Sequence, residues 1–183
     1  MRWLFLLFLF VTLLSGCSEN ESYLFNPNNN SFTQKNIIET NTPTVFCFLS
    51  PTCPLCIKQT NTLQKLINKY NSKISFYIII PSNQLPEITI TQSCALFSLH
   101  CPIYIDKHSR FSKQKGASTT PQYQIYSNKQ KVYDGRLDNT FKAINTPSFA
   151  PEYINYLNNA IDSLIDHKKI AVPSTTPVGC FIE

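Results

Sequence analysis

Two cysteines separated by two residues, in Cys53-Pro54-Leu55-Cys56, are the residues of this sequence best suited to chemistry. They follow a short apolar run and open a segment with helical periodicity, so they stand where a strand joins a helix. Cysteines three positions apart on a first helical turn lie on the same side, at a separation that suits a disulfide. The pair is therefore suited to cycle between a dithiol and a disulfide.

The position of Cys53 distinguishes the two thiols. At or just before the first helical residue, unpaired N–H groups and the helix dipole stabilise a thiolate. We therefore expect a lowered pKa at Cys53, which makes it the attacking sulfur. Cys56, one turn inside the helix, is then the resolving thiol. Pro54 fits the first turn because a first-turn N–H has no helical partner in any case.

Two other uses of this cysteine pair stay open from its spacing alone. A purely structural disulfide is one, although closing so small a loop adds little stability. Half of a zinc site is the other, but it needs a second pair of ligands. The candidates for that pair are His100, Cys94 and Cys101, which lack zinc-finger spacing.

Composition excludes several other classes of protein. Of the 183 residues, 43% are hydrophobic and 13% aromatic, which excludes disorder as the main state. With 4 glycines, the chain has neither a P-loop nor a GxGxxG pattern. The net charge of +5 is diffuse, with Lys168-Lys169 as the only adjacent basic pair, so we expect no nucleic-acid partner. The 7 cysteines point instead to thiol chemistry.

The N-terminus predicts export. Arg2 precedes an apolar run from Trp3 to Leu14 that is too short to span a membrane, so residues 1–16 are predicted as a signal peptide. Leu14-Ser15-Gly16-Cys17 resembles the bacterial lipobox, which implies cleavage before Cys17 and a lipid on its sulfur. Ser18 then favours the outer over the inner membrane of the cell envelope. The alternative is an ordinary signal peptide that leaves Cys17 free.

The mature chain is predicted to have a polar lipidated tether at 17–43 and one domain at 44–183. Apolar runs predict strands at 44–49, 75–80 and 102–106, and a β-hairpin at 122–134. Helical patterns predict helices at 53–70 and 153–167 and a helical turn at 110–115. Alternating strands and helices indicate an α/β sandwich around a mixed sheet.

Several segments together carry a resemblance to a known family. They are Phe48 to Cys56, Ile105-Asp106-Lys107, Thr119-Thr120-Pro121, Asp134 to Asn139, and Val178-Gly179-Cys180-Phe181-Ile182-Glu183. This combination resembles thioredoxin-fold redoxins, and more closely the exported bacterial redoxin-domain proteins related to the alkyl hydroperoxide reductase and thiol-specific antioxidant group. The resemblance implies a thioredoxin-like three-layer sandwich, with a mixed central sheet flanked by helices.

The resemblance also implies roles for residues outside the cysteine pair. Pro121 would follow a cis peptide bond and face the dithiol, and Thr120 would offer backbone groups to a substrate chain. Cys47 stands where thioredoxin has a buried Asp that serves proton transfer, and we interpret it as a small core residue. Asp106 is interpreted as a strand-end or turn carboxylate rather than a base.

The remaining cysteines leave alternatives open. Cys94 and Cys101 either pair with each other or stay separate thiols. Cys180 is either a third redox thiol that relays electrons or a residue that pins the tail, as a static disulfide or a buried thiol.

The functional hypothesis is a membrane-anchored thiol–disulfide oxidoreductase without a cofactor. It would act on disulfide- or dithiol-containing proteins, exchanging electrons with a membrane thiol carrier. One alternative is a thiol peroxidase of the peroxiredoxin type, although Phe46 stands where the first proline of that signature belongs. Another is a non-enzymatic copper-binding module using Cys53 and Cys56 as soft ligands.

Overall fold

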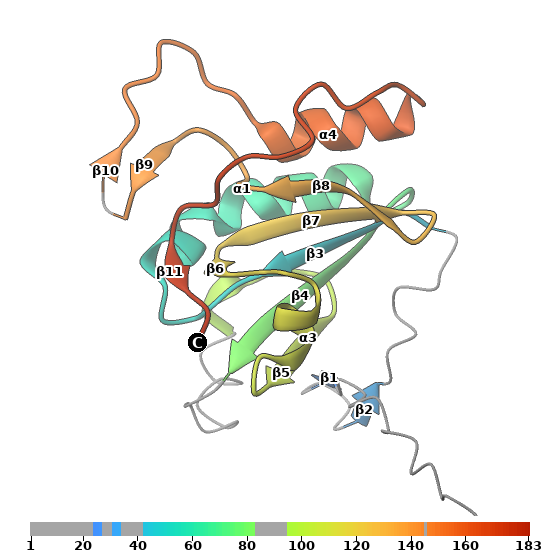
Figure 1. The fold of residues 1–183 in the computed structure, drawn as a ribbon, viewed down its shortest axis with the longest axis vertical. Helices are drawn as coiled ribbons and strands as arrows, with labels where there is room; N and C mark the ends of the chain where they lie inside the picture. The colour runs from blue at the N-terminus through green and yellow to red at the C-terminus, as the bar shows by residue number, and fades with distance from the viewer. Residues whose placement is uncertain (1–23, 27–30, 34–41, 83–94, 145) are drawn as a thin grey trace, which may run out of the picture.

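A mixed seven-stranded sheet is the middle layer of this computed structural model (Figure 1). The strand order is β2-β1-β5-β4-β3-β7-β8; β3, β4 and β5 run parallel, and the other pairings are antiparallel. The structure describes residues 24–26, 31–33, 42–82, 95–144 and 146–183. The strands of this sheet are β1 (Leu24–Asn26), β2 (Ser31–Thr33), β3 (Thr44–Phe48), β4 (Ser75–Ser82), β5 (Ile103–Lys107), β7 (Gln122–Ser127) and β8 (Gln130–Gly135).

The central strand β3 is buried on both faces, as its continuous apolar sequence predicts. Val45 and Cys47 belong to the hydrophobic cluster on one face of the sheet, and Phe46 and Phe48 to the cluster on the other. Side chains alternate along a strand, so only an uninterrupted apolar run fills both layers. This strand leads straight into the loop before Cys53.

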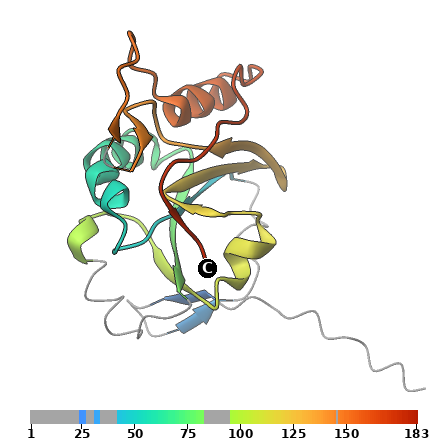
Figure 2. The ribbon, with the colours of Figure 1, turned by 60° about the vertical axis from the view of Figure 1, so that its left-hand side comes forward.

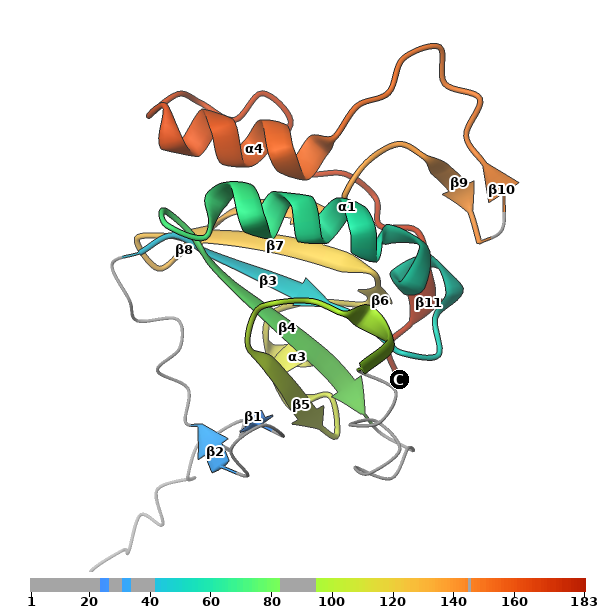
Figure 3. The same ribbon diagram turned by 180° about the vertical axis from the view of Figure 1, so that it is seen from behind.

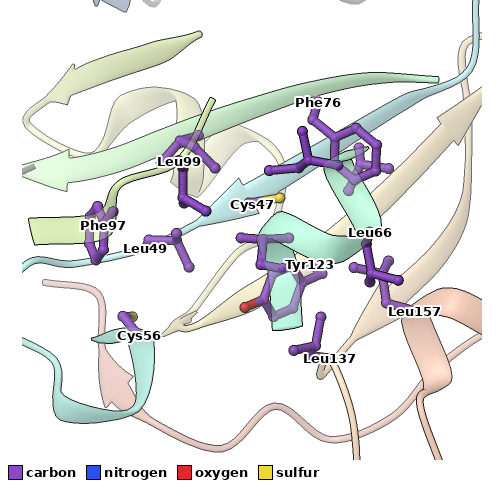
Figure 4. Packing of buried hydrophobic residues seen from close by; sticks show 14 of the residues in the cluster. Cys47, Leu49, Cys56, Leu66, Phe76, Phe97, Leu99, Tyr123, Leu137 and Leu157 are labelled. Atoms are coloured by element: carbon purple, nitrogen blue, oxygen red, sulfur yellow. The ribbon is translucent and has the colours of Figure 1, made fainter. Parts of the chain in front are cut away.

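Helices cover both faces of the sheet, which makes the fold a three-layer sandwich (Figures 2 and 3). The helices α1 (Pro54–Tyr70) and α4 (Tyr156–Ile165) share one face, and α3 (Arg110–Gln114) lies on the other. Figure 4 shows Leu66 of α1 and Leu157 near Tyr123 in the core between helices and sheet. The α/β sandwich with a mixed central sheet, predicted from the sequence, is confirmed.

Two short strand pairs and one short helix complete the described elements. The pair that concerns the site joins β6 (Thr119–Thr120) to β11 (Cys180–Phe181) at the C-terminal end of the chain. The other pair joins β9 (Phe141–Ala143) to β10 (Thr146–Pro147). A 3-10 helix, η2, covers Ala95–Phe97.

Three of the differences between the structure and the sequence prediction have a clear physical reason. The strand predicted to stop before Pro81 continues to Ser82. Its pairing with β3 ends at Ile79, so on that side no strand requires an N–H from Pro81, and the pairing with β5 continues to Ser82. The last helix begins at Tyr156 rather than Tyr153, because the Asn155 side chain accepts from the N–H of Asn158 and caps it.

The third difference lies in the segment predicted as a polar tether. Its apolar residues Leu24 and Phe25 are buried, and β1 pairs with β5 and β2 at the edge of the main sheet. The burial of Leu24 and Phe25 and the pairing of β1 with β5 attach this segment to the sheet. Cys17 and the predicted signal peptide lie outside the described residues. Among those described, no helix has the length and apolar character to cross a membrane.

Candidate functional site

The turn between β3 and α1 places Cys53 at the N-terminus of the helix. Cys53 is the N-cap residue, with extended backbone, and Pro54 occupies the first turn as its missing N–H allows. The N–H of Cys53 donates to the Ser50 carbonyl at 3.1 Å, and the Cys53 carbonyl accepts from the N–H of Cys56 at 3.0 Å. The local sequence thus fixes Cys53 at the N-terminus of α1, where the backbone N–H of Cys56 acts on its sulfur.

The Cys53 sulfur lies among groups that favour its thiolate. Hydrogen bonding from the Cys56 thiol, the Cys180 thiol and the backbone N–H groups of both residues lowers the pKa of Cys53 to about 4, although burial opposes this shift. When protonated, the thiol donates to the Thr120 carbonyl at 3.1 Å. Cys53 is therefore the acidic thiol of the site.

Cys56 has the opposite character. It is 1% exposed, and its sulfur accepts from the backbone N–H of Ser50 at 3.3 Å. Burial, then the hydrogen bond and the charge at Cys53, raise the pKa of Cys56 well above its ordinary value of 9.0. At neutral pH the pair therefore holds one thiolate, at Cys53, and one protonated thiol, at Cys56.

The loop before β7 faces this pair. The Thr120–Pro121 peptide bond is cis, the geometry that the family resemblance implies. Thr120 pairs with Cys180 in the antiparallel ladder between β6 and β11, and the N–H of Ile182 donates to the Ser118 carbonyl at 2.9 Å. The C-terminal segment is thus a short strand laid along the cis-proline loop (Figure 1).

Cys180 is part of the site rather than a remote tail residue. Its thiol donates to the Cys53 sulfur at 3.0 Å. Burial, then the hydrogen bond and the charge at Cys53, raise the pKa of Cys180 to about 11. Gly179 permits this approach, because a Cβ at that position would overlap the Thr120 carbonyl oxygen. All cysteines of the described segments are free thiols, so the structure shows the reduced site.

The residues that the sequence analysis assigned to the core, to turns or to the surface lie outside the three-thiol site. Cys47 is fully buried in the core beside β7 (Figure 4), and burial raises its pKa well above 9.0. Asp106 is fully buried and accepts from the N–H groups of Phe111 and Ser112 at the start of α3. The exposed histidines are His100, His108 and His167.

Only one member of the possible Cys94–Cys101 pair is described by the structure. Cys101 is a half-buried free thiol, whose pKa burial raises to about 12, and Cys94 lies outside the described residues. Within the described ranges, no three His, Cys, Asp or Glu side chains form a group that could hold a metal ion.

Sequence reasoning missed two contributions to the site. The N–H of Ser50 bonds the Cys56 sulfur, a backbone role that no side-chain pattern signals. The hydroxyl of Tyr123, a fully buried residue, donates to Gln59 Oε1 at 3.0 Å one helical turn after Cys56. The sequence signal was a tyrosine two residues after Pro121, in a segment predicted only as one strand of a β-hairpin.

A cavity of about 280 Å³ opens beside the tail. Cys180 and Thr120 line it, but Cys53 and Cys56 do not. Its other lining residues are Ser50, Thr52, Pro81, Ser82, Ser109, Phe181, Ile182 and Glu183. Space for another molecule therefore adjoins Cys180 rather than the cysteine pair.

Comparison with known proteins agrees with this fold. The model of the Redoxin family matches residues 19–140. An uncharacterized conserved protein from Geobacillus kaustophilus has a TM-score of 0.73 at 20% identity, over 89% of this chain and 88% of that one. A hypothetical protein from Sinorhizobium meliloti 1021 has a TM-score of 0.72 at 18% identity, over 88% of this chain and 90% of that one.

A more distant likeness is to a secreted disulfide oxidoreductase of Mycobacterium tuberculosis. The TM-score is 0.51 at 13% identity, over 61% of this chain and 80% of that chain. No curated protein matches the sequence. At these identities the structural likenesses establish a thioredoxin-like fold and nothing finer.

Proposed function

This chain belongs to the Redoxin family, and we propose that it is a thiol–disulfide oxidoreductase whose redox centre is the Cys53–Cys56 pair. The observation that carries the proposal is the opposite shift of the two pKa values. A thiolate at Cys53 and a protonated thiol at Cys56 are what an attacking and a resolving sulfur require.

The reaction is a pair of thiol–disulfide exchanges. The Cys53 thiolate attacks one sulfur of a partner disulfide, and the other partner sulfur leaves as a thiolate. Cys56 then loses its proton and attacks Cys53 in the mixed disulfide, which closes Cys53–Cys56 and releases the partner as a dithiol. Read backwards, the same steps oxidise a partner dithiol. Thr120 and Pro121 form the loop beside which the reacting partner segment must lie.

The proposed location is the cell envelope, on a membrane. The lipobox-like Leu14-Ser15-Gly16-Cys17 supports a lipid anchor on Cys17, with the domain facing the periplasm and drawing on a membrane thiol carrier. The test is fractionation of cells that express the full chain. Wild type should sediment with membranes and Cys17→Ala should not; equal distribution of the two would exclude the anchor.

The test of the activity is a titration in glutathione redox buffers, with alkylation of free thiols and mass mapping of the disulfides. Wild type should show one reversible two-electron couple at Cys53–Cys56, and Cys53→Ser and Cys56→Ser should both lack it. A potential near thioredoxin's, about −270 mV, would indicate a reductase, and one near −120 mV an oxidant. Absence of a reversible couple in wild type would exclude the proposed activity.

The two alternatives have distinct readouts in the same preparation. A thiol peroxidase would consume hydrogen peroxide with a thiol donor, in a reaction that Cys53→Ser abolishes. A copper module would retain Cu(I) stoichiometrically when reduced, and lose it in Cys56→Ser.

A further inference from the structure

The proposed nucleophile is closed off from solvent in the reduced structure. Cys53 has 0% of its surface exposed, although its pKa keeps it ionised at neutral pH. The neighbour at its sulfur is the Cys180 thiol, 3.0 Å away. No partner disulfide reaches the Cys53 sulfur while Cys180 holds that place.

The strand β11 holds Cys180 there by backbone contacts. Cys180 pairs with Thr120, whose carbonyl oxygen is also the acceptor for the Cys53 thiol. A foreign cysteine that reacts with Cys53 must bring its sulfur to the point that the Cys180 sulfur now occupies. The tail thus sits in the place of a partner strand and presents its own cysteine.

We propose that Cys180 is a third redox-active cysteine, which forms a reversible disulfide with Cys53 and through which partner proteins exchange electrons with the Cys53–Cys56 pair. The proposal rests on the proposed oxidoreductase activity. The two sulfurs need to approach by about 1 Å to reach the length of a disulfide bond.

Electrons balance without an added oxidant. In the oxidised enzyme, the Cys180 thiolate attacks the Cys53 sulfur of the Cys53–Cys56 disulfide. That bond breaks, its electron pair goes to Cys56, and Cys56 takes up the proton that Cys180 gave up. A partner thiolate then attacks the Cys180 sulfur, and Cys53 leaves as a thiolate. The second thiol of the partner loses its proton and resolves the mixed disulfide, which releases an oxidised partner and a protonated Cys180.

Accessibility and leaving-group strength both direct the partner to Cys180. Cys180 is half-buried and lines the cavity of about 280 Å³, whereas Cys53 is fully buried and does not line it. The next residue, Phe181, is 86% exposed. A thiol with a low pKa is the better leaving group, so attack at Cys180, which expels Cys53, is favoured over attack at Cys53.

The first experiment uses the full chain with Cys56→Ser, treated with one equivalent of diamide. We expect a Cys53–Cys180 disulfide, detected after non-reducing trypsin digestion as peptide 36–58 joined to peptide 170–183, with fragmentation of the joined peptides to separate Cys53 from Cys47. In Cys56→Ser/Gly179→Ala, which keeps both cysteines but displaces the strand, the initial rate should fall about tenfold, because the effective concentration of the thiol pair falls. Cys56→Ser/Cys101→Ser is the matched control and should cross-link like Cys56→Ser.

The second experiment locates the partner's point of attack. Oxidised Cys56→Ser is mixed with limiting reduced glutathione, quenched in acid and mapped. Glutathione should be found on Cys180 about tenfold more often than on Cys53, since Cys53 is the better leaving group. Glutathione mainly on Cys53 would overturn the proposal, as would a Cys53–Cys180 bond that glutathione buffers do not reverse, or no such bond.

The wild-type titration separates this proposal from the proposed activity. A reversible Cys53–Cys56 couple with no Cys53–Cys180 bond in Cys56→Ser leaves the oxidoreductase standing and removes the role of Cys180. Loss of the wild-type couple removes both. Thermal unfolding of every variant shows whether a negative result reflects an unfolded chain.

Discussion

The sulfur atoms of Cys180 and Cys53 lie 3.0 Å apart although 127 positions separate the two residues in the sequence. The contact depends on Gly179, where a side chain would meet the Thr120 carbonyl, and on the ladder between β11 and β6. The candidate site therefore brings together three thiols, two from the start of α1 and one from β11.

Removing the Cys180 thiol should raise the pKa of Cys53. The thiol donates to the Cys53 sulfur and so stabilises its thiolate. This hydrogen bond lowers the pKa of Cys53 by less than the hydrogen bond from the Cys56 thiol does. In reduced Cys180→Ala, the loss of thiolate ultraviolet absorbance on acidification should occur at higher pH than in wild type, where it is expected at about 4. Cys180→Ser keeps a donor and should lie between them.

Cys101→Ser is the control for this titration. Cys101 is protonated at neutral pH because burial raises its pKa to about 12, so its removal should leave the curve unchanged. An identical midpoint in wild type and Cys180→Ala would contradict the hydrogen bond from Cys180 to Cys53.

The reduced protein should gain stability as pH rises from about 4 to 9. Cys53 has a pKa of about 4 when folded and its ordinary 9.0 when unfolded, so in this window the unfolded chain binds more protons. Its contribution is complete above pH 9 and is lost as the pH falls through 4. The raised pKa values of Cys56 and Cys180 keep both protonated in the folded state, and their ordinary pKa of 9.0 keeps both mainly protonated in the unfolded state below about pH 8, so they oppose the gain only near its upper end.

Thermal denaturation of reduced wild type and Cys53→Ser measures this contribution. The advantage of wild type should be larger at about pH 8 than at about pH 5. A difference between the two proteins that does not change with pH would mean that Cys53 is not ionised in the folded state.

Local patterns in the sequence were enough to predict the layers of the fold and the position of the cysteine pair. The uninterrupted apolar run of β3 requires burial on both faces, and Pro54 with the following periodicity marks the start of α1. The extension of β4 through Pro81 was missed because it depends on where its neighbour β3 ends. A single strand's sequence does not carry that information.

The third thiol shows the same limit at the site. Cys180 stands in a tail without apolar periodicity, and its place beside Cys53 arises from a backbone ladder with Thr120. Such ladders use groups that every residue has, so the sequence left the choice between a relay and a static disulfide or buried thiol open. Ser50 was missed for the same reason, because its contribution is a backbone N–H.

Asp106 should act as a structural carboxylate. It is fully buried and accepts from the Phe111 N–H at 2.9 Å and from the Ser112 N–H and hydroxyl at 2.7 Å each. Asp106→Ala leaves these donors without partners and should lower the free energy of unfolding by about 2 kcal/mol or more. Urea denaturation measures it. Asp166→Ala, which removes an exposed ion pair with Lys168, is the control and should change nothing measurable.

Tyr123 should stabilise the polar contact behind the cysteine pair. Its hydroxyl donates to Gln59 Oε1, and both residues are buried. Tyr123→Phe leaves this oxygen unbonded, and the free energy of unfolding should fall by about 1–3 kcal/mol in urea denaturation. Tyr77→Phe, which keeps the ring contacts of the half-buried Tyr77 with Phe46 and Tyr104, is the control and should change stability by less than about 0.5 kcal/mol. Equal losses in the two variants would contradict a buried hydrogen bond.

Displacing the tail strand should uncover Cys53. In wild type the thiolate is ionised at neutral pH yet 0% exposed, so iodoacetamide should modify it slowly for so acidic a thiol. Gly179→Ala keeps every cysteine but forces the strand away from the Thr120 carbonyl, so alkylation of Cys53 should accelerate by about tenfold if opening of the tail limits the reaction. Mass mapping of the alkylated peptides separates Cys53 from Cys180, which has a pKa of about 11 and should react slowly in both proteins. An unchanged rate at Cys53 would mean that the sulfur is reached by another route, and that β11 does not control access to the site.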